Sequence, residues 1–234
     1  GALSGKVTAF FASKSLRGRV NQVPLQDRPD VFQDPKFKGQ LYKLQDMVID
    51  TRALLEILSQ RYSAYIFQAE PKLQYSSNGP ILELDSATSV QANYYVFAAG
   101  EGNGELIHGI PKQPVEMQIR PLKQVMVKGN LPKIFAHAVS LKDANKPRLT
   151  ITTHPMPDGT SVWYLGGNLA EQGVSMTDDE VIAKAKSELK KLLPWVPTAD
   201  MEYATLDINR AEPAQASGAR PDLPFVKVIN DLIV

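Results

Sequence analysis

Hydrophobic and polar residues alternate with a period of two in the middle of the chain, a pattern typical of strands that bury one face. It is clearest in the stretches 115–120 and 149–154. Other β-rich runs lie at 125–127, 134–136 and 162–165. The turn residues Pro157-Asp158-Gly159 stand between two of these runs and indicate a hairpin. We therefore predict one mainly antiparallel sheet from Val115 to Leu165.

A period of 3.6 residues follows the predicted sheet and predicts a helix over 177–193. Its apolar face consists of Val181, Ile182, Ala185, Leu189, Leu192 and Leu193. Thr177 and Glu180 form a capping box, and the two aspartates between them suit the positive end of the helix dipole. Pro194 ends the helix. We expect this helix to cover a face of the sheet.

The pattern is less regular before residue 115. Residues 1–39 are polar and rich in proline, which predicts loop with one short helix near the start. Thr51 is a plausible N-cap for a helix that carries Leu54, Leu55, Leu58 and Tyr62 on one face. The remaining runs predict strands at 40–49, 65–67, 81–84, 94–99 and 201–206, and at the end of the chain at 225–229 and 232–234.

Composition excludes several functional classes. The formal net charge of +1 gives no sign of a nucleic-acid surface. The chain has no cysteine, so disulfides, thiolate metal sites and cysteine nucleophiles are excluded. No apolar run is long enough for a membrane span and no signal peptide is visible, so we expect a cytoplasmic protein.

The familiar catalytic motifs are also missing. His108, His137 and His154 lack the spacing of a zinc helix, so we predict no metal site. Neither G-x-S-x-G nor G-x-x-x-x-G-K-[ST] occurs, and the carboxylates are scattered rather than paired. A glycine loop and a few arginines remain as candidates.

The glycine loop 100–104 directly follows the apolar run 94–99. Backbone without Cβ atoms at the end of a buried strand can lie against a flat or anionic ligand, which makes Ala99, Gly100 and Gly102 candidate contacts. The loop does not match G-x-G-x-x-G, because Glu105 occupies the third glycine position. The alternative is that the glycines only turn the chain from a strand into a helix.

Two arginines, Arg210 and Arg220, lie near prolines between a predicted strand and the terminal strands. A guanidinium holds a carboxylate or phosphate through two parallel hydrogen bonds, so both are candidate substrate contacts. The alternative is a surface ion pair, for instance with Glu212 or Asp222. Arg120 has the same ambiguity, since its strand points it away from Ile119, toward solvent or toward a ligand.

Taken in order, six short segments resemble the flavin-dependent oxidoreductases of the D-amino-acid oxidase superfamily, which includes glycine oxidases and glycerol-3-phosphate dehydrogenases. They are Ile49-Asp50-Thr51-Arg52-Ala53-Leu54-Leu55, Val96-Phe97-Ala98-Ala99-Gly100-Glu101-Gly102, Ile119-Arg120-Pro121-Leu122-Lys123-Gln124-Val125, Pro157-Asp158-Gly159 with Leu165-Gly166-Gly167, Asn209-Arg210-Ala211-Glu212-Pro213 and Arg220-Pro221-Asp222-Leu223-Pro224. The segment 96–102 resembles the family's flavin-contacting turn, and the two segments that contain Arg210 and Arg220 resemble its arginine-proline segments.

The resemblance implies an α+β fold in three segments. Residues 1–110 would be a partial α/β slice of an FAD-binding domain. Residues 111–206 would be the substrate-binding domain, an antiparallel sheet with covering helices, and residues 207–234 would return toward the FAD domain. The family's N-terminal βαβ unit with its G-x-G-x-x-G is not in this sequence. We therefore expect a piece of a longer enzyme that does not retain FAD by itself.

The resemblance also implies chemistry. The parent would oxidise a small anionic amine or alcohol by hydride transfer to FAD, with Arg210 as the anchor of the substrate's anionic group and Arg220 as the next candidate. Ala99, Gly100 and Gly102 would bring backbone close to the flavin. The remaining alternative is a non-catalytic α+β binding module, in which the glycine loop only turns the chain and the arginines recognise a partner.

Overall fold

The computed structural model describes residues 21–44, 47–76, 79–107, 117–139, 147–213, 228–229 and 232–233. These residues form two compact units. The first contains the described parts of 1–48 and 121–208, and the second contains those of 49–120 and 209–234. Helices and antiparallel sheets occur together, so the predicted α+β class is confirmed.

A five-stranded sheet organises the first unit. Its strands are β7 (Met117–Gly129), β8 (Phe135–Ala138), β9 (Leu149–Pro155), β10 (Ser161–Gly166) and β11 (Glu202–Pro213). Their order is β11-β7-β10-β9-β8, and the pairs β7–β10, β9–β10 and β8–β9 are antiparallel. The antiparallel sheet predicted from the period-two pattern is therefore confirmed.

The predicted hairpin joins β9 to β10. Ser161 lies opposite Pro155, and Gly159 has a φ of +83°, a left-handed conformation that glycine adopts without strain. The Asp158 carboxylate accepts a hydrogen bond from the Thr160 N–H at 3.0 Å, which closes the turn.

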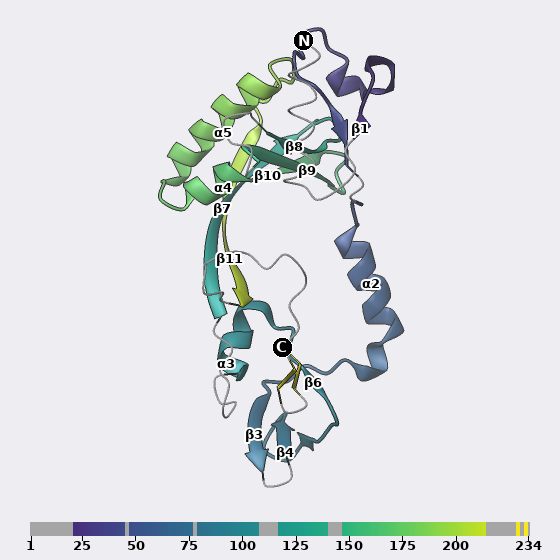
Figure 1. Ribbon diagram of the computed structural model, residues 1–234, viewed down its shortest axis with the longest axis vertical. Coiled ribbons are helices and arrows are strands. Elements are labelled where there is room, and N and C mark those ends of the chain that lie inside the picture. The colour runs from purple at the N-terminus through teal and green to yellow at the C-terminus, as the bar shows by residue number, and fades with distance from the viewer. Residues whose placement is uncertain are drawn as a thin grey trace. The chain divides into compact units, whose positions relative to one another are not determined.

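The hydrophobic core lies between this sheet and two helices, α4 (Asn168–Gly173) and α5 (Asp178–Leu192), which cover one face of the sheet (Figure 1). Alternate residues of β9 and of the second half of β7 are buried. The fully buried members include Val125, Val127, Leu149, Trp163 and Leu165 from the strands and Val181, Ala185 and Leu189 from α5. The helix predicted to cover the sheet is confirmed, together with the three central residues of its apolar face.

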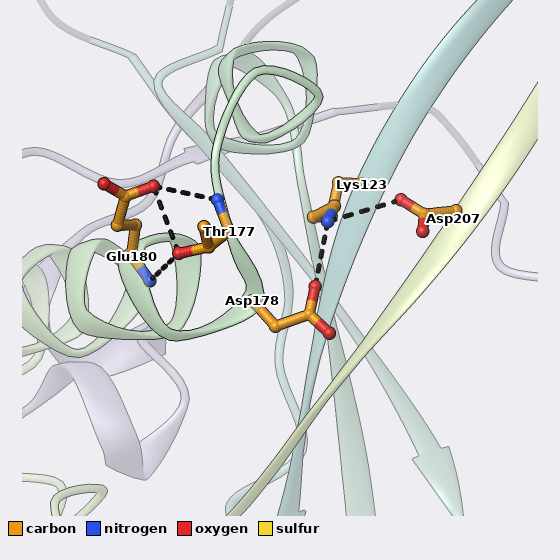
Figure 2. Close-up of polar contacts among 5 residues, drawn as sticks. All are labelled: Lys123, Thr177, Asp178, Glu180 and Asp207. Atoms are coloured by element: carbon orange, nitrogen blue, oxygen red, sulfur yellow. Dashed lines mark hydrogen bonds and ion pairs between the residues drawn. The ribbon is translucent and has the colours of Figure 1, made fainter.

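The start of α5 is fixed by two sets of polar contacts (Figure 2). The Thr177 Oγ1 accepts from the Glu180 N–H at 3.3 Å and the Glu180 carboxylate accepts from the Thr177 N–H at 2.8 Å, so the predicted capping box is present. Lys123 of β7 donates to Asp178 at 2.8 Å and lies 3.8 Å from Asp207 of β11. One lysine thus ties the first turn of the helix to two strands.

The N-terminal segment packs on this first unit. It contains β1 (Asn21–Gln22) and β2 (Tyr42–Lys43), which pair with each other, and two short 3-10 helices, η1 (Leu25–Asp27) and η2 (Asp30–Phe32). The Trp195 indole N–H donates to the Val31 carbonyl at 2.6 Å.

The boundaries of the two compact units differ from those of the predicted segments 1–110, 111–206 and 207–234. The functions assigned to those three segments stay predictions.

The second unit is built from shorter elements. They are α2 (Thr51–Arg61), η3 (Ser63–Tyr65), β3 (Lys72–Ser76), β4 (Gly79–Glu83), β5 (Ser89–Val90), β6 (Tyr95–Val96), η4 (Gly100–Gly102), α3 (Asn103–Ile107), β12 (Val228–Ile229) and β13 (Leu232–Ile233). Strands β3, β4 and β5 form an antiparallel sheet, and β13 pairs with β12 and, in parallel, with β6. The terminal strands are thus confirmed within the described residues.

Two local predictions in this unit are wrong. The run 65–67 forms no strand, because η3 ends at Tyr65 and irregular backbone follows. The N-cap of α2 is Asp50 rather than Thr51: its carboxylate accepts from the Ala53 N–H at 3.0 Å. Asp and Thr are both good N-caps, so the pattern alone could not separate adjacent candidates.

Acid is expected to weaken the first unit through Glu188. This α5 carboxylate is buried and pairs with Arg148 and with Lys191, and the bond to Arg148 lowers its pKa although burial raises it. A folded-state pKa below the unfolded value stabilises the protein above about pH 4.3, and this contribution is lost as the pH falls through the folded pKa.

We therefore expect the unfolding midpoint, followed by fluorescence of Trp163 and Trp195, to fall between about pH 5 and 3. Glu188→Gln should lower the midpoint at pH 7 and flatten this pH dependence. Glu202→Gln, at an exposed position of β11, is the matched control and should leave the curve unchanged. An unaltered curve in Glu188→Gln would show that the ion pair does not contribute to acid sensitivity.

Candidate functional site

The glycine loop follows a shorter strand than the sequence predicts. Strand β6 covers Tyr95–Val96 only, and Tyr94 and Val96 are exposed, so the run 94–99 is not a buried strand. Tyr95 and Phe97 are its buried residues. After Ala99 the chain forms η4 and then α3, with a φ of +58° at Gly100. Glycine is thus needed at residue 100 for the backbone conformation alone.

Asn103 holds this turn in shape, and the sequence reasoning did not assign it a role. Its side chain is buried, donates from Nδ2 to the Phe97 carbonyl at 3.0 Å and accepts from the Ala99 N–H at 2.8 Å. An amide is suited to this position because it supplies one donor and one acceptor at once. The signal in the sequence was a single asparagine between two glycines.

The loop leaves open space on its outer side. A Cβ atom added at Gly100 would meet nothing within 4 Å, and one at Gly102 would meet only the Ala99 Cβ, at an ordinary 3.5 Å. Ala99 and Gly100 are exposed. The loop therefore fits a ligand that lies against its backbone, as the flavin implied by the resemblance would.

The arginines are placed differently from the prediction. Arg210 lies within β11 and not in a loop beyond a strand, and it is half-buried. Arg120 is half-buried in β7, whereas its neighbour Ile119 is exposed, so the expected inward face of β7 is reversed here. Alternation in the sequence shows that the two faces of a strand differ in polarity, but it does not show which face is buried. Arg220 lies outside the described residues.

Two contacts define how β11 lies against β7, its neighbour in the sheet (Figure 1). A Cβ added at Gly129 would strike the Met201 sulfur, and the Lys123 ammonium lies 3.8 Å from the Asp207 carboxylate. Between the first contact and the second, the residue number falls by six along β7 (129 − 123 = 6) and rises by six along β11 (207 − 201 = 6). The two neighbouring strands are therefore antiparallel with a constant register.

Extended by three residues along each strand, the same register would place Arg120 of β7 opposite Arg210 of β11. Residues directly opposite each other on an antiparallel pair share a face of the sheet. Like charges so placed repel, and an anion between them would relieve the repulsion. Neither guanidinium is without a partner inside the protein, so an anion would add to or replace existing contacts.

The glycine loop reaches the same strands on their other face. Asn209 donates from Nδ2 to the Glu101 carboxylate at 3.4 Å, a long contact that links β11 to the loop. Successive residues of a strand point to opposite faces, so Asn209 and Arg210 do not share a face. By this register and alternation, Arg120 and Arg210 would share one face of the sheet, and the residue that contacts the glycine loop, Asn209, would lie on the other.

Other candidate sites are weaker. A shallow hollow along α2 is lined by Thr51, Arg52, Leu55, Glu56, Ser59 and Gln60, and it contains none of the predicted site residues. His154 packs against the Tyr164 ring at 4.3 Å between centroids. The part of the chain that the structure describes holds no group of three or more His, Asp or Glu arranged for a metal, and no helix long and apolar enough to cross a membrane.

Comparison with known proteins finds a relative at 39% identity and solved structures of similar fold. No family model matches the chain. A protein of Pseudomonas aeruginosa, described as a probable FAD-dependent oxidoreductase, is 39% identical over 238 residues, which cover 100% of this chain and 60% of the relative. The chain thus spans about three fifths of that relative's length.

Solved structures of similar fold include two enzymes. The crystal structure of the FAD-dependent oxidoreductase from Pseudomonas aeruginosa matches 92% of this chain and 61% of its own, with a TM-score of 0.79 and 34% identity. Iminodiacetate oxidase from Chelativorans matches 95% of this chain and 58% of its own, with a TM-score of 0.55. Its 12% identity indicates a shared fold and nothing about the substrate.

Proposed function

We propose that this chain is part of an FAD-dependent oxidoreductase, and that the full-length parent belongs to the D-amino-acid oxidase superfamily. The observation that carries the proposal is the match of the entire chain, at 39% identity, to a relative described as FAD-dependent. The similar fold, at a TM-score of 0.79, supports it.

The glycine loop is the proposed contact with the cofactor. Its backbone at Ala99, Gly100 and Gly102 is positioned by Asn103 and has open space beside Gly100. FAD, when bound, accepts a hydride from the substrate carbon that bears the amine or hydroxyl group. The role of the loop is to let the cofactor approach backbone closely, where a larger side chain would project into the open space.

The paired arginines are the proposed anchor for the substrate. Arg210, with Arg120 opposite it on β7, would hold the anionic group of a small amine or alcohol by charge-assisted hydrogen bonds. Two half-buried guanidiniums on one face would attract an anion more strongly than one, because both positive charges act on it. Arg220 remains the next candidate.

The cofactor content of two purified proteins tests the proposal. The full-length parent is expected to be yellow, with flavin absorbance and FAD near one equivalent, whereas residues 1–234 alone should be colourless. The physical reason is that FAD carries a pyrophosphate, and the sequence contains no G-x-G-x-x-G to bind it at a helix N-terminus.

A colourless parent that also fails to bind added FAD would contradict the proposal and favour a binding module. Stoichiometric FAD retained by residues 1–234 alone would instead contradict the expected weak binding. Gly100→Ala in the parent should lower FAD content, since the left-handed φ of residue 100 strains an alanine.

A further inference from the structure

Helix α2 is amphipathic, and both of its faces are exposed. Leu54, Leu55, Ile57 and Leu58 occupy one side of the helix by their spacing, and their exposed fractions are 42, 63, 61 and 41%. Arg52 and Glu56 occupy the other side, where they form an exposed ion pair at 3.0 Å. We refer to the four apolar side chains as the α2 surface.

The other long helix of the chain shows what such a face ordinarily does. In α5 the side chains of Val181, Ala185 and Leu189 are fully buried against the sheet. In α2, by contrast, the structure describes no buried residue. A helix of 11 residues is marginally stable in water by itself, so its stability depends on burial of its apolar face.

The apolar character continues into the residues on either side of α2. Ile49 precedes the helix and Ile66 and Phe67 follow it, and all three are exposed. Large contiguous apolar patches are rare on proteins that act alone and mark contact surfaces. The α2 surface and these flanking residues therefore have the composition of a protein–protein interface. The polar side of helix α2 has the composition of a surface that faces solvent.

We propose that the α2 surface docks a polypeptide segment that the parent protein carries outside this chain. The length of the relative supports this occupant. The match covers 60% of it, so about two fifths of the relative's length (100 − 60 = 40%) has no counterpart in these 234 residues. The inference depends on the longer parent of the proposed function, but it does not depend on a bound flavin.

Single cysteines can test this docking, because the chain has no cysteine of its own. Leu58→Cys places a thiol on the α2 surface and Gln60→Cys places one on the polar side of the same helix. Each variant is made in residues 1–234 and in the full-length parent, is treated with a maleimide, and its labelled peptide is quantified by mass spectrometry. Leu55→Cys is a second reporter should Leu58→Cys prevent folding of the parent.

The thiol at residue 58 is expected to react at least about tenfold more slowly in the parent than in the isolated chain, because burial limits reagent access to transient opening. The thiol at residue 60 should react equally fast in both. Equal rates at residue 58 would overturn the proposal. Protection that appears in the isolated chain and grows with its concentration would assign the surface to a second copy and also overturn it. Flavin absorbance of the parent samples tests the proposed function independently of the labelling rates.

Discussion

Arg210→Lys is expected to lower kcat/KM of the full-length parent by about ten- to 150-fold, or roughly 1.5–3 kcal/mol in barrier height. Lysine keeps the positive charge but cannot form the two parallel hydrogen bonds of a guanidinium. Steady-state kinetics with the parent's substrate measures the effect.

FAD content and thermal stability should change little in this variant, which separates an anchoring role from a structural one. Arg52→Lys, at an exposed position of α2, is the matched control and should leave kcat/KM unchanged. If Arg210→Lys unfolds the protein, Arg210 is a structural ion-pair partner instead. Full activity in Arg210→Lys together with inactivity in Arg220→Lys would assign the anchor to Arg220.

Leu165→Ala is expected to destabilise the first unit by about 2–5 kcal/mol, the range for removing a fully buried leucine from a close-packed core. Leu165 lies on β10, is 0% exposed and belongs to the cluster between the sheet and α5. The alanine would leave a cavity that the rigid sheet cannot collapse around.

Leu206→Ala removes the same atoms from β11, where the side chain is 44% exposed, and should cost less than about 1 kcal/mol. Urea unfolding followed by tryptophan fluorescence compares the two, since both tryptophans belong to the first unit. Equal losses in the two variants would mean that the cluster around Leu165 is not the stabilising core.

The sequence predicts the first unit well because its signals there are local. The capping box at Thr177, the 3.6-residue period of α5 and the Asp158-Gly159 turn each depend on residues within one element. The alternation in β9 is strong because Leu149, Ile151 and Thr153 are buried whereas the residues between them are only half-buried. The hydrophobic pattern of these segments agrees with the packing of their side chains, so the helices and strands can be predicted from local sequence.

The second unit and the candidate site are less predictable because they depend on partners distant in sequence. The run 94–99 is apolar enough for a strand, but only Tyr95–Val96 finds a strand to pair with, β13 near the end of the chain. The neighbouring positions of Arg120 and Arg210 follow from the register of β7 against β11, which no local motif encodes. Asn103 is visible as a residue, but its two hydrogen bonds exist only once the turn is formed.

The strand order of the large sheet has a consequence for how the first unit folds. Strands β8, β9 and β10 are consecutive in the sequence and adjacent in the sheet, so they can pair through short chain closures. Strand β7 pairs with β10, although β8 and β9 lie between them in the sequence. Strand β11 forms the edge of the sheet beside β7, and α5 separates it in the sequence from β10. Folding rates fall as contacts become more distant in sequence, so we expect the β8–β10 array to form first and β11 to join the sheet last. Arg210 lies on that last strand, so the proposed anion site would form only when the sheet is complete.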